Sequence, residues 1–187
     1  MDEAGRGPLA GPLVAAAVSL PPCACLEGVT DSKKLSDIKR RTLFPEIVRI
    51  AAGYSTGIVQ PSEIDRVGMA EAVRLAFSRA AQTIDIQNAL YLVDGLPVRN
   101  LNLPSRYIVK GDSKSLSIAA ASIIAKVTRD DIMIMADSEF PGYGFASNKG
   151  YGSREHMKAI DEIGPSPIHR MSFAPLKYEK QIRINFE

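Results

Sequence analysis

Apolar residues recur along this chain with two spacings, one typical of strands and one typical of helices. Short, mostly apolar runs predict strands at residues 13–20, 54–59, 90–93 and 107–109. Apolar positions three or four residues apart predict helices over residues 36–52, 61–86, 115–138 and 153–163. Because strands and helices alternate, the pattern predicts an α/β fold in which helices flank a central sheet.

The residue types at the ends of these segments support the predicted boundaries. Ser36 and Ser153 can cap helix N-termini, and Gly164 is a typical C-terminal stop. Pro45 should kink or split the first helix. No internal repeat is visible, so we expect one domain over residues 1–187, whose helical and extended C-terminal segment starts at about residue 153 and wraps across the body.

The composition is that of an ordinary soluble protein of 187 residues, with 45% hydrophobic and 24% charged residues. A net charge of +2 permits an anionic partner without requiring one. Cys23 and Cys25 are separated by one residue, which suits neither an unstrained disulfide nor a zinc site. No apolar stretch is long enough to span a membrane, and no signal peptide is visible. We therefore expect a cytoplasmic protein with no membrane association.

The first residues of the chain carry the strongest chemical signal. Asp2 and Glu3 are adjacent carboxylates, and bound divalent cations would remove their repulsion. Gly5 and Gly7 allow the backbone to approach a bulky anion closely. Arg6 between them can donate two parallel hydrogen bonds to phosphate oxygens. This combination indicates metal-dependent chemistry on phosphodiesters.

Two further acids follow predicted strands. Asp94 and Asp112 lie where side chains are mounted rigidly, so they could meet Asp2 and Glu3 at one edge of the sheet. Two cations held by four carboxylates can activate water and stabilise a leaving oxygen. Mg²⁺ and Mn²⁺ both suit such ligands. Taken alone, Asp94-Gly95 is more simply explained as a turn.

Several ordered motifs give the chain a resemblance to the ribonuclease HII family. They share the family's order and spacing from Asp2 to about Phe173: residues 2–12 (DEAGRGPLAGP), 31–35 (DSKKL), 93–95 (VDG), 110–114 (KGDSK), 118–123 (IAAASI), 125–130 (AKVTRD) and 149–152 (KGYG). The resemblance implies a ribonuclease H-like fold with a mixed central β-sheet. It also implies an endonuclease that cuts the RNA strand of RNA–DNA hybrids, and that cuts on the 5′ side of a single ribonucleotide in duplex DNA. The products would carry a 3′-hydroxyl and a 5′-phosphate, as ribonucleotide excision repair requires.

The same resemblance assigns roles to individual residues. Asp2, Glu3, Asp94 and Asp112 match the metal-binding catalytic acids. Gly5-Arg6-Gly7 matches the loop that reads the ribonucleotide's 2′-hydroxyl, the group that distinguishes RNA from DNA. The remaining candidates are a tyrosine that would lie against the next deoxyribose and four lysines that could contact phosphates: Tyr151, Lys33, Lys34, Lys114 and Lys149. Without the resemblance, Tyr151 would be interpreted as a half-buried aromatic and the lysines as solvated. His156 and His169 are expected on a helix surface or in packing roles.

Two alternatives remain open at this point. Ribonuclease HIII is a related family, but it carries an extra N-terminal domain and a lysine-type glycine loop, whereas this chain has Arg6 and Tyr151. The other alternative is a protein that binds hybrids without cutting them, and under either reading we expect a monomer. Family members carry several apolar residues before the first acid, whereas here Met1 directly precedes Asp2. We therefore expect a short first strand with weak metal binding and low activity in this form.

Overall fold

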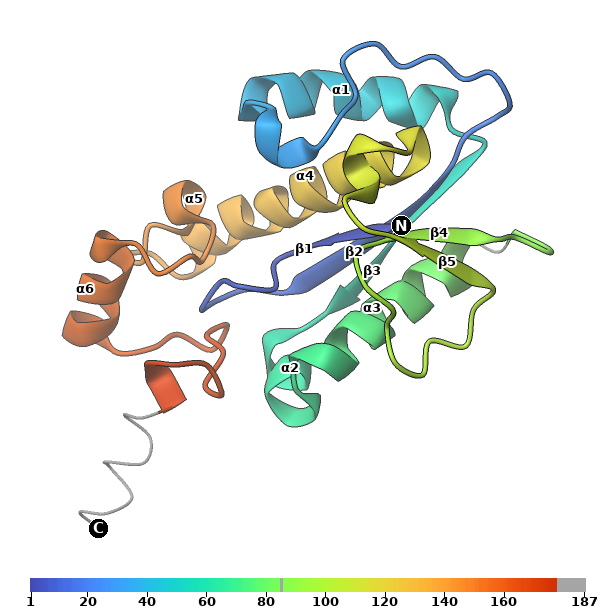
Figure 1. Ribbon diagram of the computed structural model, residues 1–187. Helices are drawn as coiled ribbons and strands as arrows, with labels where there is room; N and C mark the ends of the chain where they lie inside the picture. The colour runs from blue at the N-terminus through green and yellow to red at the C-terminus, as the bar shows by residue number, and fades with distance from the viewer. Residues whose placement is uncertain (85, 178–187) are drawn as a thin grey trace.

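The computed structural model describes residues 1–84 and 86–177, and it contains two sets of strands joined into one layer (Figure 1). Three antiparallel strands run in the order β1 (Asp2–Ala4), β2 (Leu13–Ser19) and β3 (Gly53–Val59). Two parallel strands, β4 (Tyr91–Asp94) and β5 (Ser105–Ile108), form the other set. The predicted strands are thus all present, with ends shifted by up to two residues.

Met1 joins the two sets of strands. Its amino group donates a hydrogen bond to the Leu92 carbonyl (2.6 Å), and its carbonyl accepts one from the Asp94 N–H (3.0 Å). Both bonds flank Val93, which is the pattern of a parallel pair. The strand order across the molecule is therefore β3-β2-β1-β4-β5, and the sheet is mixed, as predicted.

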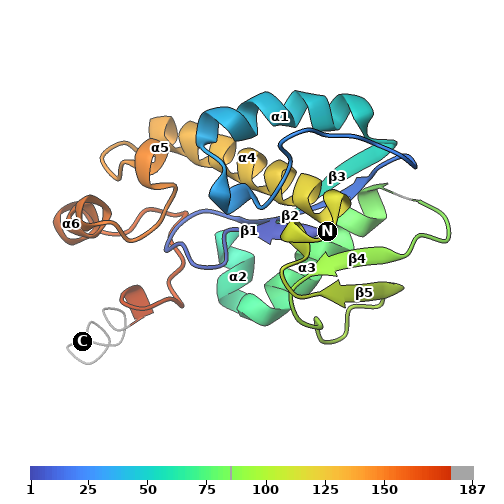
Figure 2. The same ribbon diagram turned by 45° about the horizontal axis from the view of Figure 1, so that its top comes forward.

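Helices cover both faces of this sheet (Figure 2). The helical elements in the described residues are α1 (Asp37–Ile50), α2 (Pro61–Val67), α3 (Met69–Ile84), α4 (Leu116–Glu139), α5 (Phe145–Asn148), α6 (Arg154–Ile163) and the 3₁₀ turns η1 (Ser32–Lys34) and η2 (Gly111–Ser113). On one face α4 packs against β1 and β2, and α1 packs on α4. On the other face α3 packs against β2 and β3. None of the described helices is long and apolar enough to cross a membrane.

The alternation of side chains along β2 explains why helices pack on both faces of the sheet. Leu13, Ala15 and Ala17 pack into the core on the α3 side, whereas Ala16 and Val18 pack with α1 and α4. Side chains of a strand point to its two faces in turn, so a strand that is apolar at nearly every position is buried on both sides. Small alanines let the long helix α4 approach the sheet closely.

Three sequence-based boundaries need correction. The region expected to form one helix over residues 61–86 is divided at Gly68, whose positive φ of 79° ends α2 before α3 begins. Pro45 does not split α1, which continues to Ile50. The short helix α5 lies between the helices predicted over residues 115–138 and 153–163, where no helix was expected. The predicted caps at Ser36 and Ser153 are confirmed, since each hydroxyl accepts a backbone N–H.

Residues 164–177 return across the body, as expected for a proline-rich segment. His169 pairs with Ala10 in an isolated antiparallel bridge. The Asp65 carboxylate of α2 accepts hydrogen bonds from the N–H groups of Met171 and Ser172. Phe173 packs against the core. The segment therefore connects the glycine-rich loop after β1 with helix α2.

Candidate active site

Asp2 and Asp94 are neighbours on one face of the sheet. The parallel pairing of Met1 with Val93 sets Asp2 beside Asp94, and residues side by side on paired strands point the same way. Asp2 pairs with Ala16, which packs on the α4 side, whereas Glu3 pairs with Ala15 on the α3 side. Asp2 and Glu3 therefore leave the strand in opposite directions, with the Asp94 carboxylate close enough to influence both.

Burial and like charge disfavour ionisation of these acids. Asp2 is 8% exposed, and burial together with the Glu3 and Asp94 carboxylates raises its pKa to about 8. Burial also raises the pKa of Glu3, although Arg6 opposes this. The pKa of Asp112, in η2, is raised by burial and by Asp31 and Asp94. Without a cation the group is electrostatically unfavourable.

Hydrogen bonds in this cluster are few. The Glu3 N–H donates to Asp2 Oδ1 (2.7 Å), and the Gly111 N–H donates to Asp94 Oδ1 (2.6 Å). Arg6 Nη1 lies 3.3 Å from Glu3 Oε1, although the Arg6 side chain is 61% exposed. Within the described part of the chain, neither Asp2 nor Asp94 forms an ion pair with a basic side chain.

The loop after β1 is held from inside by two buried arginines. Arg129, 1% exposed on α4, donates to the carbonyls of Pro12 (2.9 Å) and Ala10 (3.0 Å). Arg170, fully buried, donates to the carbonyls of Gly5 (2.7 Å), Gly11 (2.7 Å) and Arg6 (3.3 Å). Burial lowers the pKa of Arg170 to about 9, so the side chain stays cationic at neutral pH.

Gly5 shows why this loop requires a glycine. Its φ is +100°, and an added Cβ would lie 2.2 Å from Arg129 Nε and 2.7 Å from the Pro12 carbonyl oxygen. The carbonyls of Gly5 and Arg6 point inward to Arg170. In a trans peptide the N–H points opposite to the carbonyl, so the N–H groups of Arg6 and Gly7 point away from Arg170. Among the described residues, neither N–H has a protein acceptor.

Tyr151 lies beside this loop. A Cβ added at Gly7 would be 3.8 Å from Tyr151 Cε1, which is ordinary van der Waals contact. The Tyr151 side chain is half-exposed, and the Arg129 guanidinium carbon is 6.0 Å from its ring centroid. Arg129 Nη1 also donates to the Lys149 carbonyl (2.9 Å). One buried arginine thus connects the glycine loop with the turn that carries Tyr151.

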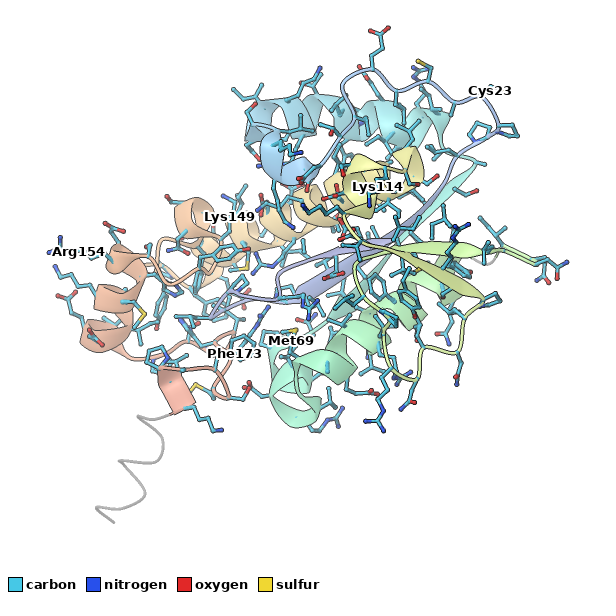
Figure 3. All side chains as sticks on the ribbon, in the orientation of Figure 1. Cys23, Met69, Lys114, Lys149, Arg154 and Phe173 are labelled. Carbon is cyan, nitrogen blue, oxygen red and sulfur yellow. The ribbon has the colours of Figure 1, made fainter. Side chains whose placement is uncertain are left out.

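The four candidate lysines occupy different places. Lys33 and Lys34 line a hollow that also contains Asp94 and Asp112. Lys114 and Lys149 lie near opposite ends of α4 (Figure 3). Each of these two ammonium groups donates to a nearby backbone carbonyl, Val109 for Lys114 and Ala146 for Lys149. Only Lys33 and Lys34 therefore share a hollow with the acids.

Three residues at the site were not singled out from the sequence. Asp31 lines the same hollow as Asp94 and Asp112, and Arg129 and Arg170 support the glycine loop. Arg129 follows an apolar helical stretch, where a positive charge is unusual, and that signal could have indicated a buried role. His156 and His169 are both buried and hydrogen-bonded to each other, so of the two expected locations the helix surface is wrong and the interior is confirmed.

The donor set suits a hard divalent cation. All candidate ligands are carboxylates, and magnesium and manganese prefer oxygen donors. Among the described residues no basic side chain forms an ion pair with the buried Asp2, and a bound cation would neutralise its charge. In the described residues, however, no three His, Cys, Asp or Glu side chains converge closely enough to form a metal site as they stand.

Comparison with known proteins identifies the family. The family model described as Ribonuclease HII matches residues 1–176. Ribonuclease HII of Desulfitobacterium hafniense (strain Y51) is 49% identical over 182 residues, covering 97% of this chain and 70% of that protein. That of Geobacter metallireducens is 51% identical over 177 residues, covering 95% and 83% respectively.

A solved structure agrees with these matches. The crystal structure of ribonuclease H2 from Pyrococcus horikoshii OT3 superposes with a TM-score of 0.80 at 29% identity, covering 97% of this chain and 96% of that one. The fold is therefore ribonuclease H-like, as the sequence motifs implied. Proteins so named are hydrolytic endoribonucleases, and this chain belongs to the ribonuclease HII family.

Proposed function

We propose that this enzyme cleaves the RNA strand of RNA–DNA hybrids and cuts duplex DNA on the 5′ side of a single ribonucleotide. The products would carry a 3′-hydroxyl and a 5′-phosphate. One juxtaposition supports the proposal above all others: the acids of β1 and β4 adjoin the Gly5-Arg6-Gly7 loop, and Tyr151 lies against Gly7. Groups suited to the reaction and groups suited to recognising its site are thus next to one another.

Asp2, Glu3, Asp94 and Asp112 would hold the divalent metal ions, either Mg²⁺ or Mn²⁺. When bound, such ions activate water and stabilise the leaving oxygen of a phosphodiester. A ribonuclease HIII structure has been solved in complex with Mn²⁺, and it shares this fold with a TM-score of 0.74 at 21% identity. The protein's contribution is to hold the four carboxylates at one end of the sheet despite their repulsion.

The loop and the turn would select the substrate. The outward N–H groups of Arg6 and Gly7 can donate to a 2′-hydroxyl or to a phosphate oxygen, and the exposed Arg6 side chain adds a charged donor. The Tyr151 ring would pack on the sugar that follows the ribonucleotide. Lys33 and Lys34 would contact phosphates near the acids, and Lys114 and Lys149 would contact phosphates farther along the duplex.

A cleavage assay with three labelled duplexes tests this function. The substrates are a DNA duplex with one ribonucleotide, a long RNA–DNA hybrid and an all-DNA duplex, each with Mg²⁺, Mn²⁺ or chelator. We expect metal-dependent cutting of the first two, a 5′-phosphate at the junction and no cutting of the third. Cutting of the long hybrid alone would favour ribonuclease HIII-type activity, and binding without cutting would favour a recognition protein.

Cleavage of this kind would supply the first step of ribonucleotide excision repair. We propose that the enzyme acts as a monomer in the cytoplasm, since the site is formed within one chain. Light scattering of the purified protein during turnover would test the monomer.

A further inference from the structure

Two buried histidines adjoin the Tyr151 turn. His156, on α6, is fully buried, and His169 is 2% exposed. Their Nε2 atoms are 3.0 Å apart, and the aromatic rings of Tyr143 and Phe145 pack around them. Neither histidine contacts the acids, so the reaction proposed above gives them no part.

The hydrogen bonds at the outer ends of the pair fix the protons. The Ser166 N–H donates to His169 Nδ1 (2.8 Å), so this nitrogen must carry a lone pair. Burial lowers the pKa of both histidines, that of His169 to about 4, so both rings are neutral at neutral pH. The proton of His169 is therefore on Nε2, and it is donated to His156 Nε2.

His156 is then left with one possible tautomer. Because its Nε2 accepts, its proton is on Nδ1, which lies 2.8 Å from the Tyr151 carbonyl oxygen and donates to it. The bonds run in one direction, from Ser166 through His169 and His156 to Tyr151. Reversing any one bond would set two donors or two lone pairs against each other.

The last bond acts on the Tyr151 carbonyl, in a turn that Arg129 and the Leu9 N–H also hold through the carbonyls of Lys149 and Gly150. The Tyr151 N–H donates to the Asn148 carbonyl (3.0 Å), and its carbonyl also accepts the Ser153 N–H (2.8 Å). The ring itself is half-exposed, and a Cβ added at Gly7 would be in van der Waals contact with it. The orientation of the peptide at Tyr151 therefore sets where the ring lies over the glycine loop.

We propose that His169 and His156 form a directional hydrogen-bond relay that positions Tyr151 against the Gly5-Arg6-Gly7 loop. They are positioning residues for recognition of the sugar at the ribonucleotide junction. This role rests on the proposed function, whereas the relay itself can be measured without any substrate.

Nitrogen NMR of the metal-free protein tests the relay directly. At about pH 7 we expect two neutral rings, His169 protonated at Nε2 and His156 protonated at Nδ1, with a nuclear Overhauser contact between the Tyr151 ring and the Gly7 α-protons. A charged ring, or the opposite tautomer at either residue, would overturn the relay. This outcome does not depend on whether the protein cleaves anything.

Kinetics then separate positioning from packing. His156→Leu removes the bond to Tyr151, whereas the amide of His156→Asn can replace the Nδ1 donor. On the single-ribonucleotide duplex we expect His156→Leu to raise KM about tenfold, with kcat changed less than about twofold, and His156→Asn to recover most of the loss. His169→Leu should raise KM about as much as His156→Leu does. His169→Gln should raise KM less, because its amide keeps a hydrogen-bond donor.

Ile160→Ala is the matched control, since Ile160 lies on the same buried face of α6 and has no polar atom in its side chain. It should lower the melting temperature without raising KM. If Ile160→Ala and His156→Leu raise KM alike, or if His156→Leu changes only the melting temperature, the histidines are packing residues and the proposal is wrong. Failure of the wild type to cut any substrate would instead count against the proposed function.

Discussion

The acidic end of the sheet and the neighbouring glycine loop differ in how their buried charges are stabilised. At the acidic end, Asp2, Glu3 and Asp94 repel one another, and burial raises the pKa of Asp2 and of Glu3. In the loop, Arg129 and Arg170 are equally buried, but their charges are satisfied by backbone carbonyls. The loop is held by its own arginines, whereas the acids would gain a counter-charge from a bound cation.

This difference separates two kinds of residue that sequence motifs treat alike. A neutralising substitution among the acids should remove function and relieve repulsion, because in the described residues Asp2 and Asp94 pair with no basic side chain and Glu3 pairs only with the exposed Arg6. The same kind of substitution at a buried arginine should remove stability, because each arginine joins segments far apart in the sequence. Four measurements test this difference.

Asp94→Asn should have the largest effect. We expect cleavage to fall by roughly a thousandfold or more, because a metal-binding charge is lost. The metal-free protein should melt at the same temperature or higher, since one repulsive charge is gone and the Asn Oδ1 can still accept the Gly111 N–H. Asp161→Asn, at an exposed position on α6, should change neither property. A large drop in the melting temperature of Asp94→Asn would make Asp94 a structural residue.

Arg129→Lys should mainly affect stability. Lysine keeps the charge but cannot reproduce the planar fork that reaches the carbonyls of Ala10, Pro12 and Lys149. We expect a loss of about 3 kcal/mol in the free energy of unfolding, measured by denaturant titration. Arg41→Lys, on the surface of α1 and paired with Asp37 and Asp131, should cost less than about 1 kcal/mol. Equal losses in the free energy of unfolding at the two sites would show that the hydrogen bonds of the buried Arg129 guanidinium contribute no more than a surface ion pair.

The pH dependence of the free energy of unfolding should show that the fold disfavours ionisation of Asp2. Its pKa is about 8 in the fold and 3.8 as the ordinary value, so between these two the folded state binds more protons than the unfolded state. The stability that Asp2 contributes is complete below its ordinary pKa and is lost as the pH rises through about 8. The slope is about −1.4 kcal/mol per pH unit within that window, or roughly 2 to 3 kcal/mol between pH 5 and 7.

Asp2→Asn supplies the reference for that measurement, because other groups titrate in the same range and cancel in the difference. Denaturant curves in chelator at several pH values should show the wild type losing stability with rising pH relative to Asp2→Asn. Saturating Mn²⁺ should flatten the difference. Parallel pH profiles in chelator would mean that Asp2 ionises normally and that the acidic end is not strained.

Tyr151→Ala should have the smallest effect and a selective one. Loss of the ring should reduce kcat/KM on the single-ribonucleotide duplex about tenfold more than on a long hybrid, because the ring orients one sugar at the junction. Tyr54→Ala, at an exposed tyrosine on β3, should reduce neither. Equal losses on both substrates after Tyr151→Ala would remove the case for junction recognition.

Local residue patterns were sufficient for most of the secondary structure. The apolar run in residues 13–20, the serine caps at Ser36 and Ser153, and the strand-ending Asp94-Gly95 depend on neighbours in sequence, which is why they could be predicted. The boundary at Gly68 was missed because a glycine inside a helical pattern has two outcomes, and packing of α2 and α3 selects one.

Tertiary contacts, and not local sequence, determine which acids repel one another and which arginines are hydrogen-bonded to carbonyls. Arg129 lies more than a hundred residues from the carbonyls of Ala10 and Pro12, and Arg170 is even farther in sequence from Gly5. His156 and His169 likewise come into contact although they are 13 residues apart and His169 lies outside helix α6. A sequence specifies that such polar groups exist, but burial and partner geometry set their pKa values and protonation, and those arise only when distant segments meet.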